Sequence, residues 1–136
     1  MNRVHVRIRI GSEDYALPVE SVTEVAELGD VTPVPGAHAA VLGARNLRGQ
    51  VLPVIDMAAV FGLPSGSPRR LVVADHDGRR AGLAVDAVAS VEPLPDLSEE
   101  ADSKHLVGAT LIDASLVGVV DVRSVLDAVG AEAAGG

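Results

Sequence analysis

The sequence predicts a mainly β protein in which two small, similar barrels pack as a pseudo-symmetric pair. Three observations support this fold class: an alternating strand pattern near the N-terminus, repeated hairpin signals, and an internal duplication. Residues 4–10 (VHVRIRI) alternate strictly between apolar and polar side chains, which is typical of a half-buried strand. The buried face is expected to carry Val4, Val6, Ile8 and Ile10. The other face carries His5, Arg7 and Arg9, where solvent or an acidic partner would meet them.

Turn signals divide the rest of the first half into short elements. Residues 11–14 (GSED) turn the chain into a second predicted strand at 15–18. Residues 32–36 (TPVPG) predict a rigid loop, because both prolines fix φ and lack a backbone N–H. Residues 42–47 and 50–55 then predict a hairpin around Arg48-Gly49, where the glycine tolerates a positive φ.

The second half repeats this arrangement with its own residues. Residues 15–25 lie over 81–91 at an offset of 66, and residues 42–61 lie over 107–126 at an offset of 65. Residues 70–85 (RLVVADHDGRRAGLAV) accordingly predict a hairpin like the one at the N-terminus. Two long blocks that match at nearly one offset indicate a duplicated unit.

The duplication also aligns helix and strand signals. Asp56 and Asp121 each precede a short amphipathic segment, so both are predicted to be helix N-caps. Pro53 lies over Gly118, and since neither residue suits a central strand, we expect a bulge or an edge position at both. We therefore predict one domain over 1–130 made of two intertwined barrels. Its repeat cores are 4–61 and 70–126, with an acidic linker or loop at 93–104 and a frayed tail at 131–136.

Composition excludes several classes of function. The chain has 136 residues, a net charge of −8, no cysteine, and only two aromatic residues, Tyr15 and Phe61. Nucleic-acid binding is excluded because it needs clustered basic residues, and single-strand binding usually adds stacking aromatics. Disulfides, thiolate metal sites and cysteine nucleophiles are ruled out, and the start of the chain lacks the apolar core of a signal peptide.

Catalytic motifs are also missing from the sequence. The four histidines have no metal-ligand spacing, and Walker A, GxGxxG and GxSxG motifs do not occur. The cluster 75–78 (DHDG) is the best candidate for a metal or ligand site in a small β-barrel enzyme or binding domain. Its simpler interpretation is a hairpin turn that uses Asp and Gly for their backbone geometry. We expect no enzyme activity and no cofactor.

One segment carries a family signature. NLRGQVLPVIDM (46–57) resembles the N-L-R-G-x-h-h-P-h-h-D-h signature (h, apolar) of CheW-type chemotaxis coupling proteins. The resemblance extends to 13–25, 32–36, 82–95 and 116–126, which is nearly the whole chain. It implies a CheW-like fold of two five-stranded SH3-like β-barrels with short helices. It also implies a non-catalytic cytoplasmic adaptor that couples methyl-accepting chemoreceptors to the CheA histidine kinase at the inner face of the membrane.

The resemblance also implies site residues. The family's receptor-contacting arginine falls on Arg48, and its glutamate partner falls on Glu24, flanked by Val22 and Val25 near the receptor groove. The kinase-binding residues are not identified by any motif. Arg45 and His38 depart from the family pattern, since members more often carry a small or β-branched residue at the first position. A CheW-like scaffold in a non-motility two-component pathway is the alternative.

The internal repeat adds an argument of its own for Arg48. Under the duplication Glu24 lies over Ser90 and Arg48 over Asp113, whereas the core valines and capping aspartates match between the halves. If Arg48 served only the fold, its counterpart would not need to be acidic. We therefore predict that Glu24 and Arg48 form a functional pair on the first barrel.

Overall fold

Ten strands, two α-helices and one 3-10 turn make up the part of the chain that the computed structural model describes, namely residues 2–64, 66–101 and 103–130. In chain order they are β1 (Arg3–Ile10), β2 (Glu13–Pro18), η1 (Val19–Ser21), β3 (Val22–Glu27), β4 (Val41–Leu47), β5 (Gln50–Asp56), α1 (Met57–Val60), β6 (Arg70–His76), β7 (Arg79–Val85), β8 (Ala87–Leu94), β9 (Leu106–Ile112), β10 (Ser115–Val120) and α2 (Val122–Val129). The predicted tail, 131–136, lies outside the described residues, and the single domain over 1–130 stays a prediction.

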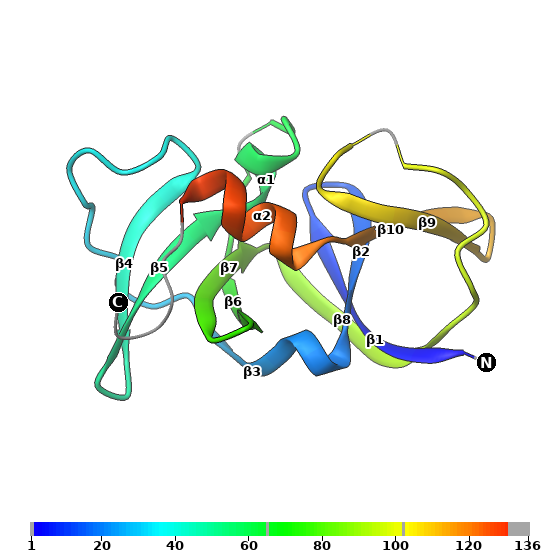
Figure 1. Cartoon of the computed structure of the whole chain (residues 1–136), viewed down its shortest axis with the longest axis horizontal. Helices are drawn as coiled ribbons and strands as arrows, with labels where there is room; N and C mark the ends of the chain where they lie inside the picture. The colour runs from blue at the N-terminus through cyan, green and yellow to red at the C-terminus, as the bar shows by residue number, and fades with distance from the viewer. Residues whose placement is uncertain (1, 65, 102, 131–136) are drawn as a thin grey trace.

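The strands form two five-stranded sheets, and Figure 1 shows them side by side. The central barrel has the order β3-β6-β7-β5-β4 and is built from consecutive strands of the chain. The terminal barrel has the order β8-β1-β2-β10-β9 and is built from both ends of the chain. In each sheet an isolated bridge, Thr32 to Ala44 or Glu99 to Ala109, links the segment that follows one end strand to the other end strand. The predicted class, mainly β with two SH3-like barrels, is confirmed.

Each sequence repeat is divided between the two barrels. The hairpin β1–β2 of the first repeat pairs with strands of the second repeat, and the hairpin β6–β7 of the second pairs with strands of the first. Equivalent residues occupy equivalent ladder positions. His5 pairs with Pro18 and Leu71 pairs with Ala84, which are the same positions 66 residues apart. In the fold, the two sequence repeats therefore exchange their first hairpins symmetrically.

The Gly-Ala dipeptide before each late hairpin has a steric reason in this fold. A Cβ on Gly43 would lie 2.1 Å from the Thr32 carbonyl oxygen, at the bridge that closes the central barrel. A Cβ on Gly108 would lie 2.9 Å from Leu97 Cδ1 and 3.3 Å from the Glu99 carbonyl oxygen in the terminal barrel. Glycine is retained in both repeats because backbone approaches backbone closely at this point.

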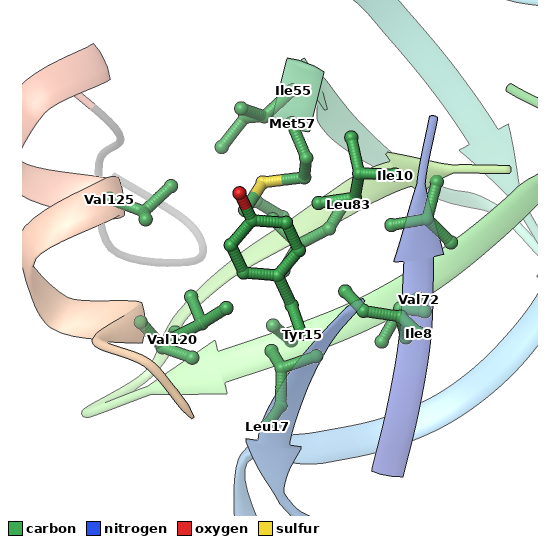
Figure 2. Packing of buried hydrophobic residues seen from close by; sticks show 14 of the residues in the cluster. Ile8, Ile10, Tyr15, Leu17, Ile55, Met57, Val72, Leu83, Val120 and Val125 are labelled. Atoms are coloured by element: carbon green, nitrogen blue, oxygen red, sulfur yellow. The ribbon is translucent and has the colours of Figure 1, made fainter. Parts of the chain in front are cut away.

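Most of the buried apolar side chains lie between the barrels rather than inside them. This inter-barrel cluster takes residues from β1 and β2 on one side and from β5, β6 and β7 on the other, and α2 covers it with Val122, Val125 and Leu126. Figure 2 shows Tyr15 at its centre, and the Tyr15 ring stacks on Phe61 with centroids 4.5 Å apart. Removing this large apolar area from water holds the two barrels together.

The two predicted helix caps are confirmed. Asp56 accepts a hydrogen bond from the Ala58 N–H at 3.1 Å, and Asp121 accepts one from the Ser124 N–H at 3.1 Å. These bonds satisfy donors that the first turn of a helix leaves without partners. Helix α2 ends at Gly130, whose φ of 71° is the usual left-handed stop.

Three expectations about strands were wrong. Pro53 and Gly118 lie in interior strands and not at a register shift. Pro53 is tolerated because the ladder from β5 to β7 begins only at Val54. The stretch 93–104 is not all linker, since its first two residues end β8. The polar face of β1 is not a solvated stripe, because His5 is only 9% exposed and Arg7 is half-buried beside Glu92.

Candidate functional site

The turn that carries Arg48 is a two-residue hairpin loop between β4 and β5. Leu47 pairs with Gln50, and the two residues between them have φ of 51° (Arg48) and 83° (Gly49). Positive φ at both central positions defines a type I′ turn. The Asn46 side chain accepts a hydrogen bond from the Gly49 N–H at 3.0 Å and so secures the turn without help from Arg48.

Two other hairpins of the chain use the same turn with different residues. Asp77-Gly78 joins β6 to β7, and Asp113-Ala114 joins β9 to β10, with first-position φ values of 52° and 48°. Aspartate tolerates the left-handed region because its short side chain bonds locally, whereas a long side chain there costs roughly 1–2 kcal/mol. Arg48 is thus the residue of least backbone compatibility among the three first positions.

The Arg48 guanidinium reaches back to β3. Its Nη2 lies 2.6 Å from Glu24 Oε2, and the arginine side chain is 74% exposed while the glutamate side chain is 28% exposed. The structure therefore brings together the two charged residues that the sequence singled out. An exposed pair of this kind contributes only about 0–1 kcal/mol to stability, which does not outweigh the backbone cost of Arg48.

The ion pair lies at the seam of the central barrel, where its end strands β3 and β4 face each other. Backbone bonds of 2.8 and 2.7 Å between Thr32 and Ala44 close one end of this seam. In the middle, Arg45 Nε donates to the Leu28 carbonyl at 2.9 Å. The ion pair of Glu24 with Arg48 links the two sides at the other end of the seam. The Arg48 guanidinium is therefore presented at the end of a seam that the Thr32–Ala44 and Arg45–Leu28 contacts also hold together.

Val22 and Val25 occupy different surroundings from the ion pair. A register shift between Val22 and Glu24 forms a β-bulge, so residues on its two sides change face. Val22 packs against the inter-barrel cluster, whereas Ala26, two residues after Glu24, packs inside the central barrel. Val25 is half-buried and pairs with Val72. The role of both valines in binding stays a prediction.

Sequence reasoning missed the seam contact of Arg45. Its guanidinium lies over Gly29, where a Cβ would be 2.7 Å from Nε, so this glycine makes room for the arginine. In the terminal barrel the equivalent residue is Thr110, whose hydroxyl donates to the Asp96 carbonyl at 3.4 Å. A closer comparison of the two repeats could have found this contact, because Arg45 stands where the second repeat has Thr110.

The alternative site at 75–78 is explained by the hairpin it forms. Asp75 accepts a hydrogen bond from the Gly78 N–H at 3.3 Å and lies 3.4 Å from Arg80, so its carboxylate is engaged in the turn. Asp77 occupies the left-handed first position of the turn. Across the described ranges, no three His, Asp or Glu side chains are grouped as a metal site would require.

Helix length bears on membrane crossing. The α-helices of the described chain have four and eight residues, and neither has the length and apolar character that a transmembrane span needs.

Two intertwined SH3-like barrels with an arginine displayed at a tight turn place the chain in a class of two-barrel β modules. A family model described as "CheW-like domain" matches residues 5–130, and the chain belongs to this family. It is 31% identical over 140 residues to "Chemotaxis protein CheW" of Rhizobium meliloti (strain 1021), covering 95% of this chain and 90% of the relative. It is 29% identical over 144 residues to "Probable chemotaxis protein CheW" of Rhizobium etli, covering 98% and 93%.

A solved structure supports the same assignment. The scaffolding protein TtCheW from Thermoanaerobacter tengcongensis superposes with a TM-score of 0.80 at 27% sequence identity, over 90% of this chain and 86% of that chain. The resemblance expected from the signature 46–57 is thereby confirmed for the family and for the fold.

Proposed function

We propose that this protein is a non-catalytic adaptor of bacterial chemotaxis signalling, which couples methyl-accepting chemoreceptors to a CheA-type histidine kinase. Membership of the CheW-like family supports the proposal, as do the names of the two relatives described above, both of which are chemotaxis proteins. One solved structure with the same fold is that of a scaffolding protein. The adaptor needs no cofactor and works in the cytoplasm, where receptors hold it beneath the membrane.

The observation that carries the proposed receptor contact is the position of Arg48. It occupies a strained first position of a type I′ turn, the turn is already secured by Asn46, and the equivalent position in the other barrel is Asp113. The conformational cost of its backbone, roughly 1–2 kcal/mol, exceeds the stabilisation that an exposed ion pair contributes. A residue retained at such a cost is explained by what its side chain does outside the fold.

Glu24 completes the proposed contact. With a side chain 28% exposed, it is the more buried partner and directs the Arg48 guanidinium along the seam. A guanidinium offers five donors in one plane, so Arg48 can keep its bond to Glu24 and still donate to carboxylates or carbonyls of a receptor helix. Val25 on β3, half-buried, would flank this contact, and Val22 would support it from the core.

The test replaces Arg48 by alanine and measures binding to purified cytoplasmic receptor tips. A desolvated arginine at the centre of an interface costs about 2 kcal/mol or more when it is truncated. We therefore expect Arg48→Ala to weaken binding at least about 10-fold and to leave the melting temperature within a few degrees. Arg123→Ala is the matched control, because Arg123 is 71% exposed and also forms a surface ion pair.

Equal receptor binding by Arg48→Ala and the unchanged protein would refute the assignment of the contact. The adaptor role itself is tested by co-sedimentation with receptor and kinase together. Kinase recruitment that does not depend on added adaptor would refute it, and so would a protein that binds neither partner. Recruitment of a kinase by receptors that serve another output would support the alternative, a CheW-like scaffold in a non-motility pathway.

A further inference from the structure

An open cavity of about 430 Å³ lies at one end of the terminal barrel, away from the Arg48 turn. Its floor consists of buried side chains, namely His5, Leu94 and Val119, at 9%, 2% and 4% exposure. Leu97 and Val107 line its walls and are 45% and 59% exposed. The remaining lining residues are Arg3, Pro18, Pro95 and Asp96. Exposed apolar walls inside a charged rim are typical of a protein interaction site.

In the central barrel, the positions equivalent to the cavity-lining residues are packed with the chain's own side chains. The equivalents of His5, Pro18 and Val119 are Leu71, Ala84 and Val54, which are buried at 0–1% exposure in the interior of the central barrel. The equivalents of Leu94 and Leu97 are Leu28 and Val31, which pack against that interior. The decisive change is a leucine in one barrel and a histidine in the other.

The interiors of the two barrels also differ in charge. Val73 of the central barrel corresponds to Arg7, and Ala26 corresponds to Glu92. Arg7 and Glu92 form an ion pair at 3.7 Å, and Arg7 Nε is buried without a hydrogen-bond partner among the described residues. The apolar interior of the terminal barrel is consequently small, with Ala16, Leu94 and Val117 as its buried members. The cavity is therefore a place where the chain does not complete its own packing.

The hydrogen bond of His5 fixes the chemistry at the floor of the cavity. His5 Nδ1 lies 2.9 Å from the Arg3 carbonyl oxygen, which can only accept, so Nδ1 carries the proton and donates. In the Nδ1–H tautomer that this bond selects, Nε2 is an acceptor, and Nε2 makes no hydrogen bond to any residue that the structure describes. An occupant that matches this floor has an apolar body and one N–H or O–H donor.

We propose that the cavity binds an aromatic side chain with a hydrogen-bond donor, a tryptophan or tyrosine, presented by a partner protein. These side chains combine a large apolar area with one donor, and they are enriched at the energetic centres of interfaces. A second copy of this chain cannot supply one. It has no tryptophan, and its single tyrosine, Tyr15, is 9% exposed and stacks on Phe61.

This binding site is independent of the proposed receptor contact. Every residue that lines the cavity belongs to the terminal barrel or its loops, whereas Glu24 and Arg48 belong to the central barrel. A partner held through the cavity and a partner held through Arg48 would therefore occupy different barrels at the same time.

The first test uses N-acetyl-L-tryptophanamide as the probe, titrated into the ¹⁵N-labelled full-length protein. We expect millimolar binding, with NMR shift changes centred on His5, Leu97 and Val107. Because the chain has no tryptophan, the fluorescence of the probe reports the same event without background. N-acetyl-L-phenylalaninamide, which lacks the donor, should bind roughly 3- to 10-fold more weakly.

Three variants locate the site. His5→Leu copies Leu71 of the other barrel, so it should abolish probe binding while the melting temperature stays equal or rises. Val107→Glu should weaken binding at least about 10-fold, because it places a charge on an apolar wall. Leu42→Glu is the matched control, since Leu42 is the equivalent exposed residue of the central barrel, and it should leave binding unchanged.

Shift changes that centre elsewhere, or probe binding that survives His5→Leu, would overturn the site. Equal affinity for the phenylalanine and tryptophan probes would overturn the assigned donor. The capped peptide Ala-Ala-Trp-Ala-Ala separates a protein partner from a small molecule. Binding at least as tight as that of the free probe supports the partner, and failure of the peptide to bind where the free probe binds would overturn it.

Discussion

Arg48 can be compared with the residues that occupy the same turn position in two other hairpins of this protein. Within the described residues three hairpins share one turn type, and their first positions carry Arg48, Asp77 and Asp113 at nearly the same φ. The backbone requirement is therefore constant while the side chain changes. Such an internal comparison separates what the turn needs from what the side chain adds.

This comparison predicts the effect of Arg48→Asn on stability. Asparagine visits the left-handed region readily, so the substitution relieves a strain of roughly 1–2 kcal/mol and loses an exposed ion pair of about 0–1 kcal/mol. We expect the free energy of unfolding in urea to stay equal or to rise by about 1 kcal/mol. Receptor binding should fall as it does in Arg48→Ala.

Asp113→Asn is the control at the equivalent turn, where the native residue is already compatible with its backbone. It should change neither stability nor receptor binding. A loss of stability in Arg48→Asn larger than that in Asp113→Asn would show that the guanidinium serves the fold instead.

The capping aspartates were predictable from local spacing, and the ion pair of Arg48 with Glu24 was expected from the family resemblance with support from the repeat, while its role in binding stays a prediction. The burial of His5 and Arg7 was not predictable from sequence. Alternation along β1 identifies two faces but does not say what covers each of them. One face of β1 meets the inter-barrel cluster through Val6, Ile8 and Ile10, and the other turns His5 and Arg7 toward the inside of the terminal barrel, while Val4 and Arg9 stay exposed.

At the scale of elements, hydrogen bonds to His105 hold the start of helix α2 against the terminal barrel. His105 is 8% exposed, and its Nδ1 lies 2.8 Å from the hydroxyl of Ser124 on α2. The Asp121 N–H, at the helix start, donates to the His105 carbonyl at 2.8 Å. Burial lowers the pKa of His105 below its usual 6.5, the positive charge of Lys104 lowers it further, and Asp121 partly opposes both.

The sign of this shift predicts how stability depends on pH. Because the folded protein holds His105 neutral more strongly than the unfolded chain does, the unfolded chain binds more protons just below pH 6.5. The stabilisation is present above pH 6.5 and is lost as pH falls through the lower folded pKa. We expect the free energy of unfolding in urea to decline in this window for the native protein and more gently for His105→Gln.

His76→Gln is the control for a histidine at the β6–β7 turn, whose side chain is 35% exposed. It should retain the decline seen in the native protein. Identical curves for His105→Gln and the native protein would show that His105 does not couple α2 to pH.

Strand boundaries were predicted well where turns are tight and less well elsewhere. The hairpins β1–β2, β4–β5 and β6–β7 were recovered, because glycine and aspartate mark two-residue turns in the sequence. The turn expected at 11–14 was too long, since β2 begins at Glu13. The end of β8 was missed because Pro93 and the acidic residues after it suggest a loop. The seam contact of Arg45 was missed because it joins residues that only barrel closure brings together.

At the scale of the whole molecule, neither half of the chain contains a complete barrel. The hairpin β1–β2 and strands β3–β5 of the first half belong to different sheets, and each needs strands from the second half. The two halves also share the inter-barrel cluster. The cooperative unit is therefore the entire two-barrel body.

This organisation predicts the behaviour of a chain cut between the repeats. Fragments 1–66 and 67–136, produced separately, should lack a cooperative thermal transition in circular dichroism. Mixed in equal amounts, they should form a 1:1 complex that recovers the native spectrum and elutes as one species in size-exclusion chromatography. A cooperative transition in either fragment alone would contradict the prediction.

The exchange of hairpins also has a consequence for the ancestry of such a chain. Because each repeat gives one hairpin to its neighbour and receives one in return, two identical polypeptides of about half this length would satisfy the same ladders. Such a body would be a strand-swapped homodimer with two identical turns. Joining its genes would free each copy to change alone, and a chain with Arg48 in one repeat and Asp113 in the other is what that freedom allows.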